Sequence, residues 1–170
     1  MGPISLDITI DAPRERVFEM ICDLALRPRW TDHFVSDFRL SRLEASGVGA
    51  AARFRVDAPG GIRYMETVIA SARRPHAIVE QGRGGRWDHV AIIARWELSA
   101  GMAAPTELTL TFATEPRSML GGLREIRARA WWTRRWRKAL RRLAEQLETS
   151  TRAEPAVRIA GADRLPGAAH

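Results

Sequence analysis

The stretch REIRARAWWTRRWRKALRRLAEQL, residues 124–147, decides the fold of this 170-residue chain. Its apolar side chains recur every three or four residues, which is the spacing of one face of an α-helix. The pattern predicts one helix over 118–148, with Gly121-Gly122 marking a break near its start. At 1.5 Å per residue, such a helix would be about 45 Å long. Its apolar stripe comprises Leu123, Ile126, Trp136, Leu140, Leu143 and Leu147.

The surface that this helix would cover is predicted from segments with the hydrophobic period of two that β-strands show. Segment 4–10 alternates Ile and Leu with polar residues. Further segments follow after residue 33, separated by turns that contain Gly and Pro. Because the connections are short, we expect strands that are neighbours in the chain to pair antiparallel. The predicted strands are 4–10, 34–44, 50–57, 62–72, 76–82, 88–99 and 106–115.

Two short helices are predicted between the first two strands. Pro13 suits the first turn of a helix that runs to about residue 23, and Asp11 is expected to cap it. A second helical piece covers 24–31. Seven strands with one apolar face need a cover, and only helix 118–148 is large enough to provide it. Since a sheet bent around a single helix rarely fills completely, we expect an interior cavity.

Length, cysteine count and the N-terminus predict one cytoplasmic domain, and we expect a monomer or homodimer. The domain is expected at 1–148, and 149–170 is predicted to be a disordered tail because it lacks apolar periodicity. Cys22 is the only cysteine, so an internal disulfide is excluded. The N-terminus lacks the features of a signal peptide. No apolar stretch approaches the roughly 20 residues that a membrane-spanning helix needs.

Two segments resemble the SRPBCC (START-like) superfamily, especially its polyketide cyclase/dehydrase and lipid-transport group. In ITIDAPRERVFEMICDLALRPRW, residues 8–30, a strand leads into a helix and then to an aspartate and a tryptophan. In SARRPHAIVEQG, residues 71–82, a proline precedes a strand. The similarity extends over about residues 3–148. The matching residues of the first segment are Ala12, Pro13, Val17, Phe18, Asp23 and Trp30.

The resemblance implies an α+β helix-grip fold, in which a curved seven-stranded antiparallel sheet wraps around a long C-terminal helix. It also implies an internal hydrophobic ligand such as a lipid, an isoprenoid or a polyketide. We expect no cofactor. Members include lipid carriers, cyclases, hydroxylase subunits and stress proteins, so fold does not fix function. We favour a non-catalytic carrier or sensor. The alternatives are a polyketide aromatase/cyclase-like enzyme and an interaction module.

Large apolar side chains on the predicted strands and the long helix are the candidates for the cavity wall. Aromatic residues bring large contact area, and Tyr or Trp adds one polar group. The alternative for each residue is plain packing in the core. The candidate ligand pocket consists of Trp30, Phe34, Phe38, Phe54, Tyr64, Glu66, Trp96, Phe112, Met119, Leu123, Ile126 and Trp136.

Catalysis of a cyclase type needs an acid–base group and a donor for an enolate oxygen. Glu66 shares strand parity with Tyr64 and is a candidate to point inward, whereas the parity of Arg95 directs it away from the apolar face. We interpret most of these polar residues as solvated and assign no catalytic residue. The isolated histidines lack metal-ligand spacing, so no metal site is expected. The other polar candidates are Asp32, His33, Asp88 and His89.

Positive charge is concentrated in one segment. Residues 117–142 hold ten basic residues and one acidic residue, whereas the rest of the chain has 17 basic and 19 acidic residues. The simplest interpretation is the solvated outer face of an amphipathic helix. An anionic membrane surface or an acidic partner is the second possibility, and nucleic acid the third. The candidate surface comprises Arg127, Trp131, Arg134, Arg135 and Lys138.

Overall fold

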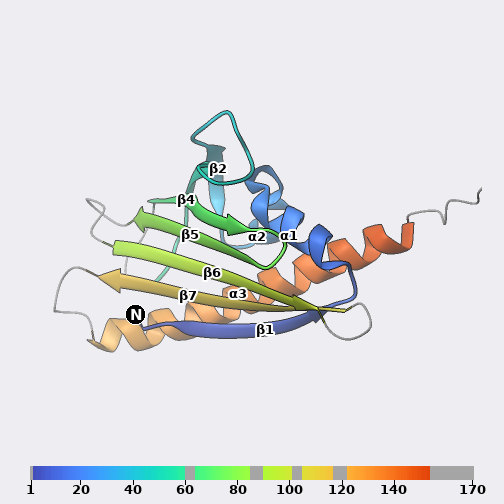
Figure 1. Ribbon diagram of the computed structural model, residues 1–170. Helices are drawn as coiled ribbons and strands as arrows, with labels where there is room; N and C mark the ends of the chain where they lie inside the picture. Colours follow the sequence, from blue (N-terminus) through green and yellow to red (C-terminus); the bar gives the residue numbers. More distant parts are fainter. Residues whose placement is uncertain (1, 60–63, 85–89, 101–104, 117–121, 154–170) are drawn as a thin grey trace, which may run out of the picture.

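Figure 1 shows the computed structural model, which describes residues 2–59, 64–84, 90–100, 105–116 and 122–153. Within these ranges, side chains are not described at 100, 116, 122–127 and 151–153. The elements are β1 (Ile4–Ile10), α1 (Arg14–Cys22), the 3₁₀ turn η1 (Leu24–Leu26), α2 (Pro28–Thr31), β2 (Ser36–Leu40), β3 (Ala51–Arg55), β4 (Tyr64–Arg73), β5 (Ala77–Gly84), β6 (Val90–Ala100), β7 (Thr106–Pro116) and α3 (Gly122–Ala153).

The strands form one seven-stranded sheet in the order β1-β7-β6-β5-β4-β3-β2. Every neighbouring pair is antiparallel. Strands β2 to β7 follow one another as a meander, and β1 joins at the far edge with Ile4 opposite Phe112. The predicted seven-stranded antiparallel sheet is therefore confirmed.

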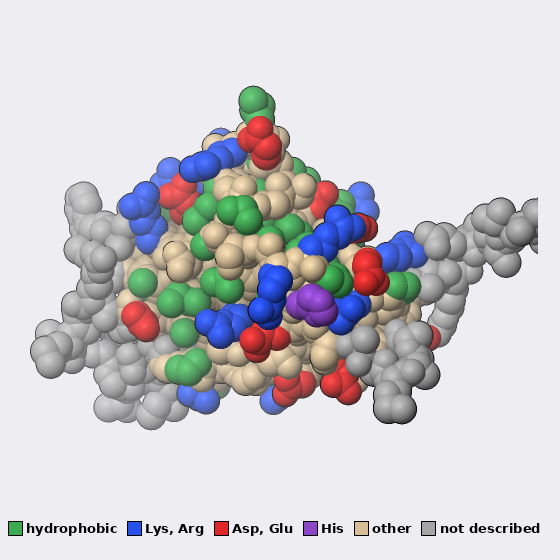
Figure 2. Space-filling view, viewed as in Figure 1, with side chains coloured by type: hydrophobic (Ala, Val, Ile, Leu, Met, Phe, Trp, Pro, Cys, Tyr) green, Lys and Arg blue, Asp and Glu red, His purple; other side chains and the backbone are tan. Residues whose placement is uncertain are grey.

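The alternation of side chains explains why one face of the sheet is apolar. In β6, Ile92, Ala94 and Trp96 are buried, while the residues between them, Ile93 and Arg95, are exposed. Figure 2 shows the side of the molecule seen in Figure 1, where hydrophobic side chains lie among charged ones. The buried face of the sheet is the one that α3 covers.

Helix α3 crosses the sheet and closes the core (Figure 1). Its buried residues recur at helical spacing, so they form one stripe against the strands. The helix begins at Gly122 and continues to Ala153, five residues beyond the predicted end at 148. The first five residues of the predicted tail are thus helical, and 154–170 lie outside the described residues. The buried stripe consists of Trp132, Trp136, Ala139, Leu140, Leu143, Ala144 and Leu147.

The segment between β1 and β2 closes one end of the core. Pro13 is the N-cap of α1 and makes no side-chain cap. The expectation that Asp11 caps this helix is wrong, because Asp11 lies two residues before the cap and cannot reach the first helical N–H groups. The predicted piece at 24–31 comprises η1 and α2, and Asp23 caps η1 by accepting from the Ala25 amide at 2.9 Å.

Strand β2 is shorter than the predicted segment 34–44. A bulge separates Ser36 from Arg39, and Asp37 has a positive φ of 50°. This irregularity interrupts regular pairing near the start of the strand. No helix within the described part of the chain is long and apolar enough to cross a bilayer.

Candidate functional site

A small cavity lies between the sheet and α3. Its volume is about 30 Å³, which is room for about one water molecule. Apolar and aromatic side chains form most of the wall: Leu24, Phe34, Val35, Phe38, Phe54, Met65, Ile92, Ala94, Phe112, Trp132 and Trp136. The polar residues that border it are Arg27, Thr31, Glu66, Thr67 and Glu80.

Phe34 is the centre of the aromatic wall. Its ring centroid lies 5.4 Å from that of Trp136 and 6.2 Å from that of Trp132, both in edge-on contacts. Phe34 is half-buried, so it borders the cavity on one side and solvent on the other. Phe38 and Phe54 are also half-buried, and their rings stack 5.8 Å apart. These three phenylalanines are the apolar lining residues that also reach solvent.

The polar end of the cavity is a buried ion pair between Arg27 and Glu80. Arg27 Nη2 lies 2.6 Å from Glu80 Oε1, and the two side chains are only 7 % and 4 % exposed. Arg27 precedes α2, whereas Glu80 lies on the inner face of β5, in phase with buried Ile78. The pair therefore joins the segment after α1 to the centre of the sheet.

Four hydrogen bonds saturate the Glu80 carboxylate. Arg27 donates through both terminal nitrogens, at 2.6 and 3.4 Å. Trp96 Nε1 donates to Oε1 at 2.8 Å, and the Thr67 hydroxyl donates to Oε2 at 3.1 Å. Because a carboxylate has about four lone-pair sites, these donors occupy its accepting capacity. A buried charge that is paired and fully hydrogen-bonded avoids most of its desolvation penalty.

The guanidinium of Arg27 also packs against the faces of two indole rings. Its central carbon lies 4.9 Å from the ring centroid of Trp30 and 5.4 Å from that of Trp96. Arg27 Nη2 additionally donates to the Ile21 carbonyl at 3.2 Å. These contacts, which include attraction between the cation and the ring faces, fix the orientation of Arg27.

A second network joins α2 to α3 at the surface. Arg142 forms an ion pair with Asp32, with a further contact of 3.2 Å between Nη2 and Oδ2. His33 Nε2 lies 3.1 Å from the Arg135 carbonyl, and its Nδ1 lies 3.3 Å from Arg142 Nη1. These partners suit a neutral imidazole with the proton on Nε2. Burial lowers the pKa of His33, and nearby Lys138 and Arg142 lower it further, while the Arg135 carbonyl opposes the shift.

The structure brings part of the predicted pocket together. Phe34, Phe38, Phe54, Phe112 and Trp136 line the cavity. Trp30 and Trp96 are fully buried and stand behind the wall, edge to face at 6.0 Å. Met119 and the side chains of Leu123 and Ile126 lie outside the described part of the chain.

Of the two predicted pocket residues on β4, Glu66 borders the cavity and Tyr64 does not. The inner face of β4 consists of Met65, Thr67 and Ile69, so the two predicted residues lie on the opposite parity. Tyr64 is 52 % exposed and does not line the cavity. Glu66 borders the cavity, but its carboxylate lies 3.6 Å from Arg83 and its side chain is 43 % exposed. The Glu66 carboxylate therefore does not point into the core, as it was expected to do.

The remaining polar candidates are scattered. Arg95 is exposed, as its parity predicted, and Asp32 with His33 belongs to the surface network. Asp88 and His89 lie outside the described residues. Of the polar residues that border the cavity, Glu66 was predicted, whereas Arg27, Thr31, Thr67 and Glu80 were missed.

The candidate surface on α3 is only partly exposed. Arg134 and Lys138 are exposed, whereas Trp131 and Arg135 are half-buried. The Arg135 guanidinium lies 5.3 Å from the Trp131 ring and donates to the His33 carbonyl at 3.3 Å. The side chain of Arg127 lies outside the described residues.

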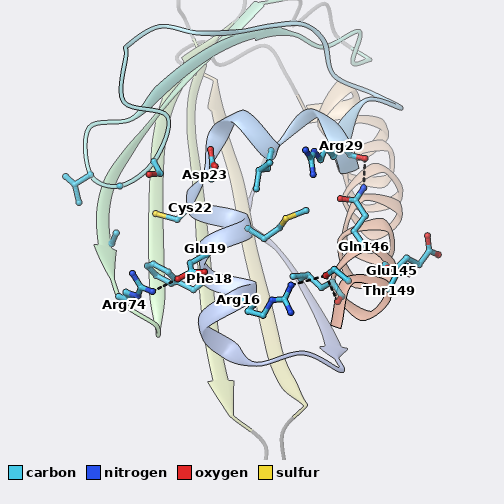
Figure 3. A pocket seen from close by; sticks show the side chains of 18 residues that line it. Arg16, Phe18, Glu19, Cys22, Asp23, Arg29, Arg74, Glu145, Gln146 and Thr149 are labelled. Atoms are coloured by element: carbon cyan, nitrogen blue, oxygen red, sulfur yellow. Dashed lines mark hydrogen bonds and ion pairs between the residues drawn. The ribbon is translucent and has the colours of Figure 1, made fainter. Parts of the chain in front are cut away.

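A second, wider hollow of about 1390 Å³ lies on the outside, around α1 (Figure 3). Helix α1 stands between the sheet and the C-terminal part of α3 in this view. The polar groups at its rim bind one another: Arg74 pairs with Glu19, and Gln146 donates to the Arg29 carbonyl at 2.8 Å. The Cys22 thiol borders it, and burial raises the pKa of this group, so the reactive thiolate is disfavoured. Because the hollow is open to solvent and these rim residues bind one another, we regard it as a surface groove and not as a ligand site.

Comparison with known proteins identifies the family. The family model described as polyketide cyclase/dehydrase and lipid transport matches residues 1–148. The chain belongs to this family, and the predicted resemblance is confirmed. No protein with a curated description matches the chain.

Solved structures share the fold. The protein TTHA0849 of Thermus thermophilus has a TM-score of 0.69 at 19 % identity, over 88 % of this chain and 99 % of the other. The major latex-like protein 151 of Panax ginseng has a TM-score of 0.65 at 10 % identity, over 86 % and 97 %. DynU16, from the dynemicin biosynthetic locus, has a TM-score of 0.59 at 20 % identity, over 88 % and 48 %. At these identities the likeness establishes the helix-grip fold and nothing further.

Proposed function

We propose that this protein binds a small hydrophobic molecule between the sheet and α3, as a carrier or sensor of a lipid, an isoprenoid or a polyketide. The observation that carries the proposal is an apolar, aromatic cavity that has a single buried ion pair at one end and half-buried phenylalanines at the other. This combination, an apolar wall with a few fixed polar groups, is typical of small-molecule sites. The family description, which includes lipid transport, supports it.

Binding requires the cavity to enlarge. A space of about 30 Å³ cannot hold a molecule larger than water. Phe34, Phe38 and Phe54 are the apolar wall residues that reach solvent, so outward rotation of these rings opens the interior at the least cost in buried contacts. The free protein is thus closed around its own aromatic side chains, and the ligand replaces them.

The alternative is a polyketide cyclase-like enzyme. The family description includes cyclases and dehydrases, and DynU16 lies in a biosynthetic locus. A general base needs a free lone pair within reach of the substrate. Glu80 is the carboxylate closest to this role, but four donors occupy it. We therefore favour binding without catalysis, in the cytoplasm.

We propose a second function for the outer face of α3: it adsorbs to an anionic membrane. Four exposed cations on this face, Arg134, Arg137, Lys138 and Arg141, form no ion pair within the part of the chain that the structure describes. No acidic residue occurs from 126 to 144. Each such cation contributes about 1 kcal/mol near an anionic bilayer. Flotation with anionic and with neutral liposomes tests this, and equal failure to bind both contradicts it.

Titration with Nile red, a neutral apolar dye, tests the proposal for the cavity. We expect a saturable emission increase with one site per chain. Ala94→Leu, which fills the cavity, should weaken binding at least about tenfold because the added side chain occupies the ligand's space. Ala91→Leu is the matched control, since Ala91 lies on the same strand but on the outer face of the sheet. Equal affinity of both variants would place the dye elsewhere and overturn the proposal.

A further inference from the structure

The buried polar atoms that lack a partner are all of one kind. Within the described residues, five buried side-chain atoms have no hydrogen-bond partner, and every one is an N–H donor. Three of them belong to residues that line the cavity: Nε of Arg27 and Nε1 of Trp132 and Trp136. The other two are Arg14 Nε and Trp30 Nε1. Three residues of the cavity wall therefore carry buried N–H groups that have no partner among the described residues.

Acceptors in the cavity are already engaged. Glu80 accepts four hydrogen bonds from Arg27, Thr67 and Trp96. The hydroxyl groups that border the cavity donate inside the protein, Thr67 to Glu80 and Thr31 to the Arg27 carbonyl at 2.8 Å. Glu66 also borders the cavity, but its carboxylate pairs with Arg83 at 3.6 Å and its side chain is 43 % exposed. Among the buried side chains of the lining, a ligand hydroxyl or amine would therefore find only these neutral hydroxyl oxygens as acceptors. Leaving a donor unpaired in an apolar site is costly.

We infer that the cavity selects a neutral, apolar molecule that carries an acceptor oxygen, such as a ketone, a quinone or an ester, and that Arg27, Trp132 and Trp136 donate to it. This inference rests on the proposed function and adds the chemical class of the ligand. The residues Arg27, Trp132 and Trp136 as a whole are 5 %, 1 % and 6 % exposed, so all three donors are shielded from bulk water. A carbonyl oxygen accepts hydrogen bonds without bringing a donor or a charge.

Charge argues against a carboxylate ligand. The positive charge of Arg27 is already neutralised by Glu80 at 2.6 Å. A ligand carboxylate would place a second negative charge beside Glu80, in a site with no further buried cation among its lining residues. Burial of an uncompensated charge is strongly unfavourable. The site should therefore discriminate between a ketone and an acid of the same size.

The inference can be tested in the unaltered protein by measuring how well four naphthalenes of matched size displace bound Nile red. The competitors are 2-acetylnaphthalene, 2-ethylnaphthalene, 1-(2-naphthyl)ethanol and 2-naphthoate. We expect the ketone to displace the dye at about threefold to tenfold lower concentration than the hydrocarbon, since one or two hydrogen bonds are gained. The alcohol should be intermediate and 2-naphthoate the weakest. Hydrophobicity alone predicts a different order, because the hydrocarbon is the least soluble in water and would then be the strongest competitor.

Conservative variants locate the donors. Trp132→Phe and Trp136→Phe keep an aromatic ring but remove the N–H, so each should reduce the preference for ketone over hydrocarbon by about threefold. Trp131→Phe is the matched control, since Trp131 adjoins Trp132 but does not line the cavity. A purely structural role would weaken both competitors equally and leave their ratio unchanged.

The possible outcomes distinguish a failure of the inference from a failure of the proposed function. If Nile red binds but ketone and hydrocarbon compete equally, the inference is overturned and the proposed function stands. If 2-naphthoate competes best, the ligand is an anion and the inference is likewise overturned. If neither the dye nor any naphthalene binds, both fail together.

Discussion

Two arginine–carboxylate pairs fix the segment between α1 and β2 to the rest of the molecule, and they differ chiefly in burial. The side chains of Arg27 and Glu80 are 7 % and 4 % exposed, whereas those of Arg142 and Asp32 are 29 % and 59 % exposed. Water screens the outer pair and weakens it. Removal of one partner from the inner pair leaves a charge that nothing else compensates. An arginine–carboxylate pair is therefore important for stability in the core and contributes little at the surface.

The largest expected effect comes from breaking the inner pair. Glu80→Leu leaves the Arg27 guanidinium buried without a counter-charge, so we expect the free energy of unfolding to fall by about 3–5 kcal/mol. Urea denaturation measures this change. A loss below about 1 kcal/mol would show that the inner pair behaves like the outer one, which contradicts the comparison.

A double variant controls for the loss of packing. Arg27→Met with Glu80→Leu removes both charges together, and we expect it to recover at least half of the stability that Glu80→Leu loses. Trp96 and Thr67 would still lack their acceptor, so full recovery is not expected. A double variant less stable than Glu80→Leu alone would contradict this reasoning.

Gly82→Ala tests the inner pair indirectly, by disturbing the contact between β5, which carries Glu80, and β4, which carries Thr67. A Cβ at Gly82 would lie 2.1 Å from the carbonyl oxygen of Glu66 on β4. Gly82 is opposite Thr67, whose hydroxyl bridges β4 to Glu80 on β5. Because backbone must move, we expect a loss of about 1–3 kcal/mol in thermal or urea unfolding. An unchanged stability would mean that β4 and β5 do not need this close approach.

Breaking the outer pair should have a small effect. Asp32→Asn removes the charge that pairs with Arg142, and we expect a loss below about 1 kcal/mol that shrinks further in high salt. The Arg142 contact lowers the pKa of Asp32, so the contribution exists at neutral pH and disappears as the pH falls through that lowered value. A loss as large as that of Glu80→Leu would remove the distinction between the pairs.

The smallest effect is a pH dependence from His33. Burial lowers its pKa in the folded protein, so the unfolded chain takes up the proton first as the pH falls below about 6.5. Stability contributed by neutral His33 is complete above that pH and decreases below it until the lowered pKa is reached. In His33→Gln, the drop in melting temperature between pH 7 and pH 5 should be smaller. An identical drop in both proteins would assign the pH dependence to other groups.

The fold was predictable from sequence because the periodicities are strong. Alternating apolar residues mark the buried face of β1 and β6, and apolar residues at helical spacing mark the buried face of α3. These patterns predict the strands, the helix that covers them and their order along the chain. Boundaries were less certain: β2 is shortened by its bulge and Asp37, and α3 extends past the predicted end at 148. These differences arise from tertiary contacts and backbone geometry that no local pattern records.

The polar end of the site could not be predicted in the same way. Glu80 follows Ala77-Ile78-Val79, which is apolar on both parities, so the pattern does not reveal which face is inward. Arg27 lies between η1 and α2, where no period applies. Its pairing with Glu80, 53 residues away, depends on how the helical segment meets the sheet. By contrast, the aromatic residues of the wall except Trp132 were identified, because large aromatic side chains are usually buried.

The central claim, a ligand held inside against buried donors, is tested most directly by the indole N–H resonances of the tryptophans. On addition of 2-acetylnaphthalene to ¹⁵N-labelled protein, we expect the signals of Trp132 and Trp136 to move downfield with one common dissociation constant, while that of Trp131 moves little. A response confined to Trp131, or none at saturating ligand, would show that the interior remains closed and would contradict the account.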